Sequence, residues 1–258
     1  MNGDWVILFS KYMKQLIISL FILFVAMLHS CNKESAPDFI QTTGEITIEE
    51  RALENFNELE VFNTINVLIV PDTVNKVIIE AGENLIPDIV TTVKEGKLIL
   101  KNTNKFNFLR SYKKEINIEV HCKSLIHLIY RGAGNIRCSK NITDSIFTLD
   151  CHRGTGSVDL LLDITEGHFN MATGQLDLTL HGKAGINYIY QVGNGYTDAS
   201  DLTTAYTFVT NKGTNDLVVQ VSYELFARLD YLGNIYYKGN PVKVGAELND
   251  QGQLIKID

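Results

Sequence analysis

Short runs in which hydrophobic and polar residues alternate follow one another through the N-terminal half of the chain. They cover residues 61–70, 76–81, 89–101 and 115–122, with turn-forming residues between them. Alternation with a period of two sends successive side chains to opposite faces of a strand, so each run predicts a β-strand. Glu95-Gly96 divides the third run and predicts a hairpin. No segment beyond the N-terminal signal has a helical pattern longer than two turns, which indicates an all-β domain.

The second half repeats a strand pattern around a recurring glycine. Successive glycines are 18 to 22 residues apart, and apolar residues favour the second and fourth positions after each one. A β-type repeat of about 20 residues is typical of a solenoid of stacked coils. The glycine is expected at a corner between two strands, where the chain must bend. The repeated corner residues are Gly134, Gly156, Gly174, Gly195, Gly213 and Gly233.

Alignment on these glycines predicts which side chains form the core. Stacking pairs each strand with its equivalents in neighbouring coils, so equivalent inward positions form continuous buried files. The second position after the glycine holds Ile136, Val158, Leu176, Thr197, Asn215 and Ile235. The fifth position before it is also expected to face inward and holds Ile129, Cys151, Phe169, Tyr190 and Phe208.

The first 30 residues form an export signal by their pattern. Lys11 and Lys14 precede the apolar run Leu16–Leu28. Its 13 residues are fewer than the ~20 that span a bilayer, and a short apolar run after lysines is typical of a secretory signal peptide. Met13 would start a more typical signal, so it is an alternative first residue.

The apolar run ends at Leu-His-Ser-Cys, which resembles the lipidation motif of bacterial lipoproteins. We expect cleavage after residue 30, a lipid on Cys31 that anchors the chain to a membrane, and a polar tether over residues 31–50. The alternative is an ordinary signal peptide followed by an unrelated cysteine. An outer-membrane lipoprotein, facing the periplasm or the cell surface, is the predicted location.

Charge and cysteine content narrow the function class. The 258-residue chain has a net charge of −7, and no basic stripe or tract is present, which argues against nucleic-acid binding. After Cys31, three cysteines remain, an odd number that predicts at least one free thiol. Cys138 and Cys151 are expected to be small buried residues; the third is Cys122.

The region from about Phe56 to Val244 resembles the head GIN domain family of putative auto-transporter adhesins. The resemblance is carried by FNTINVLIV and KVIIEAG near the start, the hairpin KEGKLIL, the glycine units GAGNI and GTGSVDL, and the closing GNIYYKGNP. It implies a right-handed single-stranded parallel β-helix, often on a bacterial lipoprotein, and brings no catalytic residues. We therefore expect a domain over residues 51–258. Its predicted parts are an N-terminal β region that caps the helix (51–122), the glycine coils (123–244) and a C-terminal tail or cap (245–258).

One outward position suggests a cation site. The third residue after the glycine is aspartate in four successive coils, and stacked coils lie ~4.8 Å apart. Carboxylates at that spacing repel one another and would favour a bound hard cation such as calcium. The alternative is a solvated acidic edge. The predicted ladder is Asp159, Asp177, Asp198 and Asp216, and no other cofactor or metal site is predicted.

Tyrosines concentrate in the C-terminal coils. Tyr196 and Tyr236 fall on outward positions and could form a recognition face for a glycan or a surface protein. The alternative is that tyrosine is there because it suits strands.

The preferred function is a lipid-anchored binding or adhesion module of the bacterial envelope without catalysis. One alternative is a polysaccharide-acting enzyme that uses the aspartates with Arg137, Arg131 or Arg153. Another is a structural envelope component that self-assembles through its strand edges.

Overall fold

The computed structural model describes residues 43–104 and 115–258, and these belong to one compact unit. The predicted signal peptide, Cys31 and most of the tether lie outside the described residues. Within the described part of the chain, no helix has the length and apolarity needed to cross a membrane.

Strands make up nearly all of the regular structure. The predicted hairpin is confirmed, since β5 (Ile89–Lys94) and β6 (Lys97–Asn102) are joined at Glu95 and Gly96, both with positive φ. The elements are β1 (Ile46–Ala52), β2 (Glu58–Asn63), β3 (Asn66–Pro71), β4 (Lys76–Gly82), the 3-10 helix η2 (Ile86–Asp88), β5 (Ile89–Lys94), β6 (Lys97–Asn102), β7 (Asn117–Cys122), β8 (His127–Gly132), β9 (Asn135–Cys138), β10 (Ile146–Gly154), β11 (Ser157–Gly174), β12 (Asp177–Gln191), β13 (Thr197–Asn211), β14 (Leu217–Leu229), β15 (Ile235–Lys238), β16 (Lys243–Leu248) and β17 (Leu254–Lys256).

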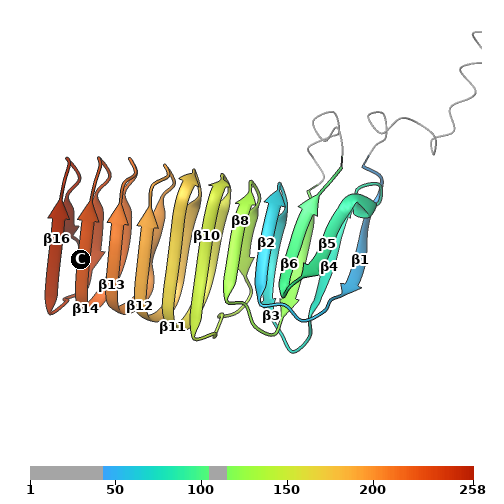
Figure 1. Ribbon diagram of the computed structural model, residues 1–258, viewed down its shortest axis with the longest axis horizontal. Coiled ribbons are helices and arrows are strands. Elements are labelled where there is room, and N and C mark those ends of the chain that lie inside the picture. Colours follow the sequence, from blue (N-terminus) through green and yellow to red (C-terminus); the bar gives the residue numbers. More distant parts are fainter. Residues whose placement is uncertain (1–42, 105–114) are drawn as a thin grey trace, which may run out of the picture. The chain divides into compact units, whose positions relative to one another are not determined.

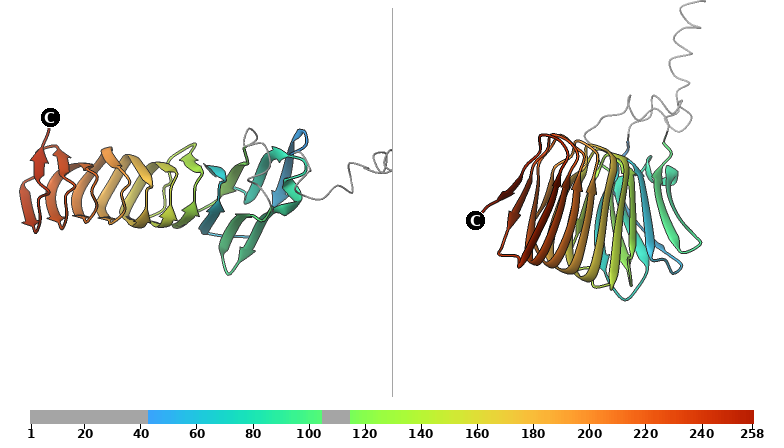
Figure 2. Two further views of the ribbon diagram at one scale, coloured as in Figure 1. Left: turned by 90° about the horizontal axis from the view of Figure 1, so that it is seen from above. Right: turned by 60° about the vertical axis from the view of Figure 1, so that its left-hand side comes forward.

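The strands form a β-solenoid of about six turns with coils about 20 residues apart, which confirms the predicted fold. The strands form one continuous sheet that wraps around the core, and its two faces of mostly parallel strands are joined through the long strands β11–β14 (Figures 1 and 2). Face A contains β7, β3, β9, the first parts of β11–β14, β15 and β17. Face B contains β6, β2, β8, β10, the second parts of β11–β14 and β16, and it faces the viewer in Figure 1.

The first coils are not stacked in chain order. Strand β2 pairs with both β6 and β8, and β3 pairs with both β7 and β9. The coil of β2 and β3 therefore lies between two coils that follow it in the sequence, as Figure 1 shows for β6, β2 and β8. Much of the predicted N-terminal β region thus belongs to the solenoid itself, because its strands offer the same inward spacing as the glycine coils.

Antiparallel strands cover the N-terminal end, as expected for a cap. Strand β4 pairs with β1 and β7, and β5 pairs with β6. Arg51 ties β1 across this end by donating to the carbonyl oxygens of Ile89 and Ile86 at 2.6 and 3.2 Å. Because β1 starts at Ile46, the folded part begins inside the segment predicted as tether.

The predicted C-terminal tail continues the stack. Strand β16 adds to β14 on face B, and β17 adds to β15 on face A. The segment 237–244 turns at Gly239, which has a φ of 94°, and leads into β16. Residues 245–258, which were predicted as a tail or cap, therefore form most of a last coil.

The interior changes in character along the solenoid. Coils from β2 to β11 bury aliphatic, aromatic and sulfur side chains, such as Leu59, Phe147 and Phe169. Strands β12 and β13 bury amides and hydroxyls as well: Asn187, Gln191, Thr197, Thr204, Thr207 and Asn211.

The three cysteines of the domain are free thiols. Cys151 is fully buried on an inward position, as predicted, and Cys138 is partly buried against the core. Burial also raises the pKa of the Cys122 thiol to about 12. A thiol with that pKa stays protonated at neutral pH, so these side chains serve as packing groups.

Candidate binding surfaces

The predicted ladder of four aspartates in consecutive coils is wrong. Asp159 and Asp198 share an outward file on face A, but Thr179 occupies the coil between them. Asp177 and Asp216 lie two residues earlier on their coils, in the neighbouring file. Because neighbouring coils are ~4.8 Å apart, carboxylates in one file are separated by about twice that distance.

The error arises because the corner glycines occupy two files. A Cβ on Gly193 would collide with the carbonyl oxygen of Gly174, and one on Gly213 with that of Gly193. A Cβ on Gly156 would instead collide with the carbonyl oxygen of Gly134. An alignment that equates Gly174 and Gly213 with Gly156 and Gly195 therefore displaces two coils by two residues relative to the others. The second file holds Gly134, Gly156, Leu176, Gly195, Asn215 and Gly233, and in both files the missing side chains let adjacent coils approach closely.

Asp177 and Asp216 have a structural role at the corners. A carboxylate oxygen of Asp177 accepts the backbone N–H of Tyr196 at 3.0 Å, and one of Asp216 accepts that of Asn234 at 2.8 Å. Asn66 does the same for the N–H of Asn135 at 3.0 Å. These hydrogen bonds connect a corner to the next coil. Since the Asp177 carboxylate already accepts a backbone N–H, a role as catalytic acid or base is not favoured.

No metal cluster is evident on either face. Among residues 43–104 and 115–258, no group of three or more His, Cys, Asp or Glu side chains could hold a metal ion. Calcium binding therefore stays a prediction without a described cluster of ligands.

The two predicted recognition tyrosines lie on face A. Tyr196 is 40% exposed at the start of β13, and Tyr236 is half-buried on β15 in the neighbouring file. Burial, with the nearby carboxylates of Asp198 and Asp216, raises the pKa of Tyr196. Its phenol is therefore neutral at physiological pH and can donate a hydrogen bond.

A larger aromatic surface lies on face B and was missed by the glycine alignment. His168, Tyr188, Phe208 and Phe226 occupy equivalent outward positions in four consecutive coils. The ring centroids of His168 and Tyr188 are 4.8 Å apart with 8° between planes, and those of Tyr188 and Phe208 are 5.2 Å apart with 16°. We call these four residues the aromatic file.

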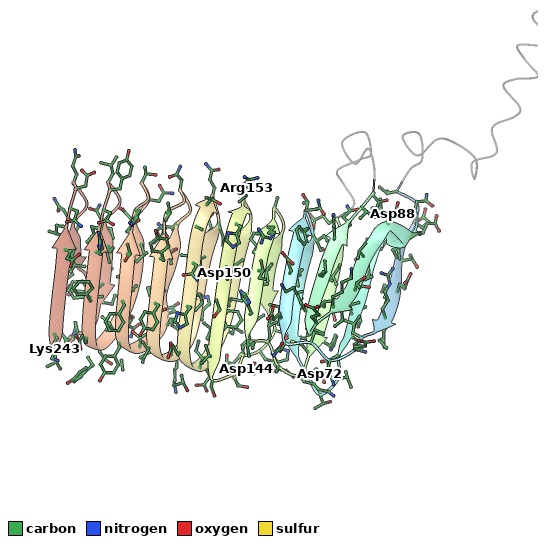
Figure 3. The ribbon with its side chains drawn as sticks, in the orientation of Figure 1. Asp72, Asp88, Asp144, Asp150, Arg153 and Lys243 are labelled. Carbon is green, nitrogen blue, oxygen red and sulfur yellow. The ribbon has the colours of Figure 1, made fainter. Side chains whose placement is uncertain are left out.

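More tyrosines flank the aromatic file. Tyr190 is 39% exposed in the next file, and Lys212 Nζ lies 5.6 Å from its ring centroid. On the other side, the rings of Tyr206 and Tyr223 are 5.1 Å apart, and Lys243 Nζ lies 5.9 Å from the Tyr223 ring. Figure 3 shows face B with Asp150 near its middle, Arg153 at the edge where the strands end, and Lys243 on the last coil.

Tyr190 and Phe208 were predicted to face the core, and this is wrong. The inward file runs through Phe169, Ile189 and Val209. Leu178, which faces inward beyond the corner, lies nine positions after Phe169. In the next coil the equivalent of Leu178, Thr197, lies only eight positions after Ile189. Positions in the strand before the corner were counted back from the glycine. A corner that is one residue shorter shifts this count by one residue, so a position predicted to face inward faces outward.

A groove of about 590 Å³ lies on face A at the N-terminal end. Outward side chains of β1, β4, β7, β3 and β9 line it, with Leu68 and Ile78 as apolar groups. Its charged groups are Glu80, Glu115, Glu119 and Arg137. Arg137 belongs to the outward file of Asp159, so the predicted basic group lies where this groove meets the glycine coils.

Comparison with known proteins identifies the family. The model of the putative auto-transporter adhesin head GIN domain matches residues 55–241. The chain belongs to this family. The match begins after β1 and extends through the coils to the turn before β16.

Solved structures share the fold at low identity. A putative adhesin from Bacteroides fragilis has a TM-score of 0.77 at 19% identity, covering 84% of this chain and 99% of that one. A putative adhesin from Parabacteroides distasonis has a TM-score of 0.63 at 18% identity, covering 84% and 99%. A putative lipid binding protein from the same species has a TM-score of 0.62 at 18% identity, covering 83% and 98%. The chain has no significant match among curated proteins.

Proposed function

We propose that this protein is a binding module of the bacterial envelope and that face B of its C-terminal coils recognises a protein partner. The observation that carries the proposal is the aromatic file together with Tyr190, Tyr206 and Tyr223. Tyrosine and other aromatic side chains on a rigid surface are typical of interface hot spots. The family is one of putative auto-transporter adhesins, and two of the similar solved structures are putative adhesins, which agrees with a binding role.

The orientation of the rings favours a protein over a glycan. Carbohydrate-binding sites commonly stack a sugar ring on an open aromatic face, in addition to hydrogen-bonding its hydroxyl groups. Inside the aromatic file the faces of Tyr188 are covered by His168 and Phe208, so their edges meet solvent. Lys212 and Lys243 lie over the rings of Tyr190 and Tyr223. The surface offers ring edges, phenol hydroxyls and ammonium groups, which suit the mixed chemistry of a protein surface.

The proposal includes a lipid on Cys31 and an outer-membrane location, as the sequence motif predicts. Metabolic labelling with an alkyne fatty acid should label the wild type and not Cys31→Ser. Protease shaving of intact cells should remove the domain if it is displayed at the surface. Unlabelled wild-type protein would refute the anchor, and full protection from protease would restrict the partner to the periplasm.

The binding surface can be tested with variants matched for exposure. Tyr190 on face B and Tyr196 on face A are equally exposed, at 39% and 40%. The chain would be measured against immobilised collagen, fibronectin and laminin, with a glycan array as the competing arm. We expect Tyr190→Ser with Phe226→Ser to weaken protein binding about tenfold or more, because truncating a hot-spot ring costs over 1 kcal/mol. Tyr196→Ser should bind as the wild type does.

The opposite pattern would move the site to face A. Binding to glycans alone would replace the proposed ligand class. If the wild type binds neither panel and captures nothing from bacterial envelopes by cross-linking, the binding role fails.

A further inference from the structure

The two ends of the solenoid are finished differently. At the N-terminal end, Leu85, Ile86 and Ile89 close the core and are 4%, 4% and 2% exposed. At the C-terminal end, Val244 and Leu248 continue the inward files of Leu225 and Leu229, yet they are 47% and 56% exposed. Their side chains have the core on one side and open space on the other. The last coil therefore presents a section through the core.

The same end offers an unpaired strand edge. Within the described residues, β16 pairs only with β14. The backbone N–H of Asn249 donates to the carbonyl oxygen of Leu229 at 2.9 Å. Backbone groups alternate in direction along a strand, so those of Leu248, Ala246 and Val244 point away from β14. Such an edge is a template for another strand.

We propose that the edge of β16 pairs antiparallel with β16 of a second copy of this chain, about a two-fold axis at Gly245. This register is self-complementary. Lys243 lies opposite Glu247 of the partner subunit, and the symmetry repeats this ion pair. On the inward side, Val244 lies opposite Ala246 of the partner subunit, and Val242, which is 72% exposed, opposite Leu248 of the partner subunit.

Hydrogen bonding agrees with this register. Val244 and Ala246 are residues whose N–H and C=O groups face the free edge, so they form the hydrogen-bonded pairs that flank Gly245. Side chains directly opposite in an antiparallel pair must lie on the same side of the sheet. Here outward charges meet outward charges, and inward apolar groups meet inward apolar groups. A C2 contact of this kind closes on itself and does not grow into a filament.

The assembly would change how the binding surface is presented. A two-fold axis perpendicular to face B keeps face B of both copies on the same side. The two aromatic files then form one extended surface with two equivalent sites, which gives avidity to a repetitive partner. The dimer itself does not depend on the proposed function.

Charge reversal with rescue tests the pairing. Sedimentation would use the chain from residue 31 with Cys31→Ser, so that no detergent is needed. We expect a concentration-dependent dimer for this reference protein. Lys243→Glu or Glu247→Lys should each raise the dimer Kd about tenfold or more, because each places like charges opposite one another. The double variant Lys243→Glu with Glu247→Lys should restore the dimer.

The rescue separates contacts between copies from contacts within one copy. Within a chain, Lys243 lies 3.8 Å from Glu224, and Glu247 lies 3.7 Å from Arg228. The double variant leaves both of these pairs repulsive, so dimer recovery must come from the opposing strand. Leu248→Lys, at an exposed position, should give a folded monomer with an unchanged circular dichroism spectrum. The proposal is overturned if the reference protein is still a monomer at ~100 µM, because a dimer with a Kd below that concentration would be the main species there. It is also overturned by a dimer that all the charge variants retain.

Discussion

The coils of β12 and β13 enclose amides and hydroxyls beside apolar side chains, whereas the coils from β2 to β11 enclose mainly apolar side chains. Phe147 represents the apolar interior, where stability comes from removing hydrocarbon from water and filling space. Asn211 represents the polar interior: its amide nitrogen donates to the carbonyl oxygen of Asn215 at 3.0 Å, and its amide oxygen accepts the N–H of Gly213 at 2.9 Å. The comparison shows that coils with an apolar interior and coils with a partly polar interior stack in the same way. Both are joined by the same backbone hydrogen bonds between parallel strands.

The largest effect is expected in the apolar coils. Phe147→Ala should lower the free energy of unfolding by about 3–5 kcal/mol, since it deletes a fully buried ring and leaves a cavity. Chemical denaturation monitored by circular dichroism measures the loss. Phe226→Ala is the control, because this residue is 37% exposed, and it should cost about 1 kcal/mol or less. Equal losses would mean that the aromatic file carries as much stability as the core.

A smaller loss is expected from the bonded amide of the polar coils. Asn211→Ala should cost about 1–3 kcal/mol, because the N–H of Gly213 and the carbonyl of Asn215 lose their partner. Hydrogen exchange should show faster exchange at Gly213 and in the corner after β13. Thr210→Ala, one residue away and facing outward, serves as the control. Unchanged exchange at Gly213 would contradict the assigned bond.

Asn187 sharpens the contrast because it is buried without a described partner. Its side-chain nitrogen and oxygen form no hydrogen bond with any residue that the structure describes, and the residue is 0% exposed. Burying an unpaired amide is unfavourable, so Asn187→Val should raise the free energy of unfolding by about 1 kcal/mol. A loss of that size would instead indicate an internal water that bonds this amide.

The smallest effect is a pH dependence at the corner of the last coils. A hydrogen bond from Asn249, followed by contacts with Arg228 and Lys212, lowers the pKa of Asp230 to about 2. The unfolded pKa is ~4, so the ionised side chain stabilises the fold above pH ~4. This contribution should be lost as the pH falls from about 4 to about 2. The difference in free energy of unfolding between the wild type and Asp230→Asn should therefore be constant at higher pH and become smaller as the pH falls through that range. A difference that stays constant down to pH 2 would refute the shift.

Much of the architecture could be predicted because it depends on local rules. Period-two alternation, a turn at Glu95-Gly96 and corner glycines are set by residues near one another in the chain. They predicted the all-β class, the stacked coils and a capped N-terminal end. The burial of Ile136, Val158 and Ile235 was also predicted correctly.

The candidate sites could not be predicted with the same reliability, because they depend on which residues meet between coils. A two-residue change of frame moved Asp177 and Asp216 out of the proposed ladder, and a one-residue difference between corners moved Tyr190 and Phe208 from the core to the surface. One signal in the sequence could have revealed the change of frame. Several corners carry a Gly-x-Gly pair, and the alignment used the second glycine of each pair. The two intervals of only 18 residues, from Gly156 to Gly174 and from Gly195 to Gly213, mark coils where the aligned glycine is the equivalent of the first.

The sequence by itself determined that this chain folds into coils with glycine at their corners. The alternation of apolar and polar residues and the conformational freedom of glycine both depend only on residues near one another in the chain. Only the tertiary structure decided the order of the first coils, the aromatic file on face B and the open C-terminal edge. These features arise from hydrogen-bond register between strands about 20 residues apart. Register is fixed by the fit of whole coils against each other, and a shift of one residue reverses which side chains meet solvent.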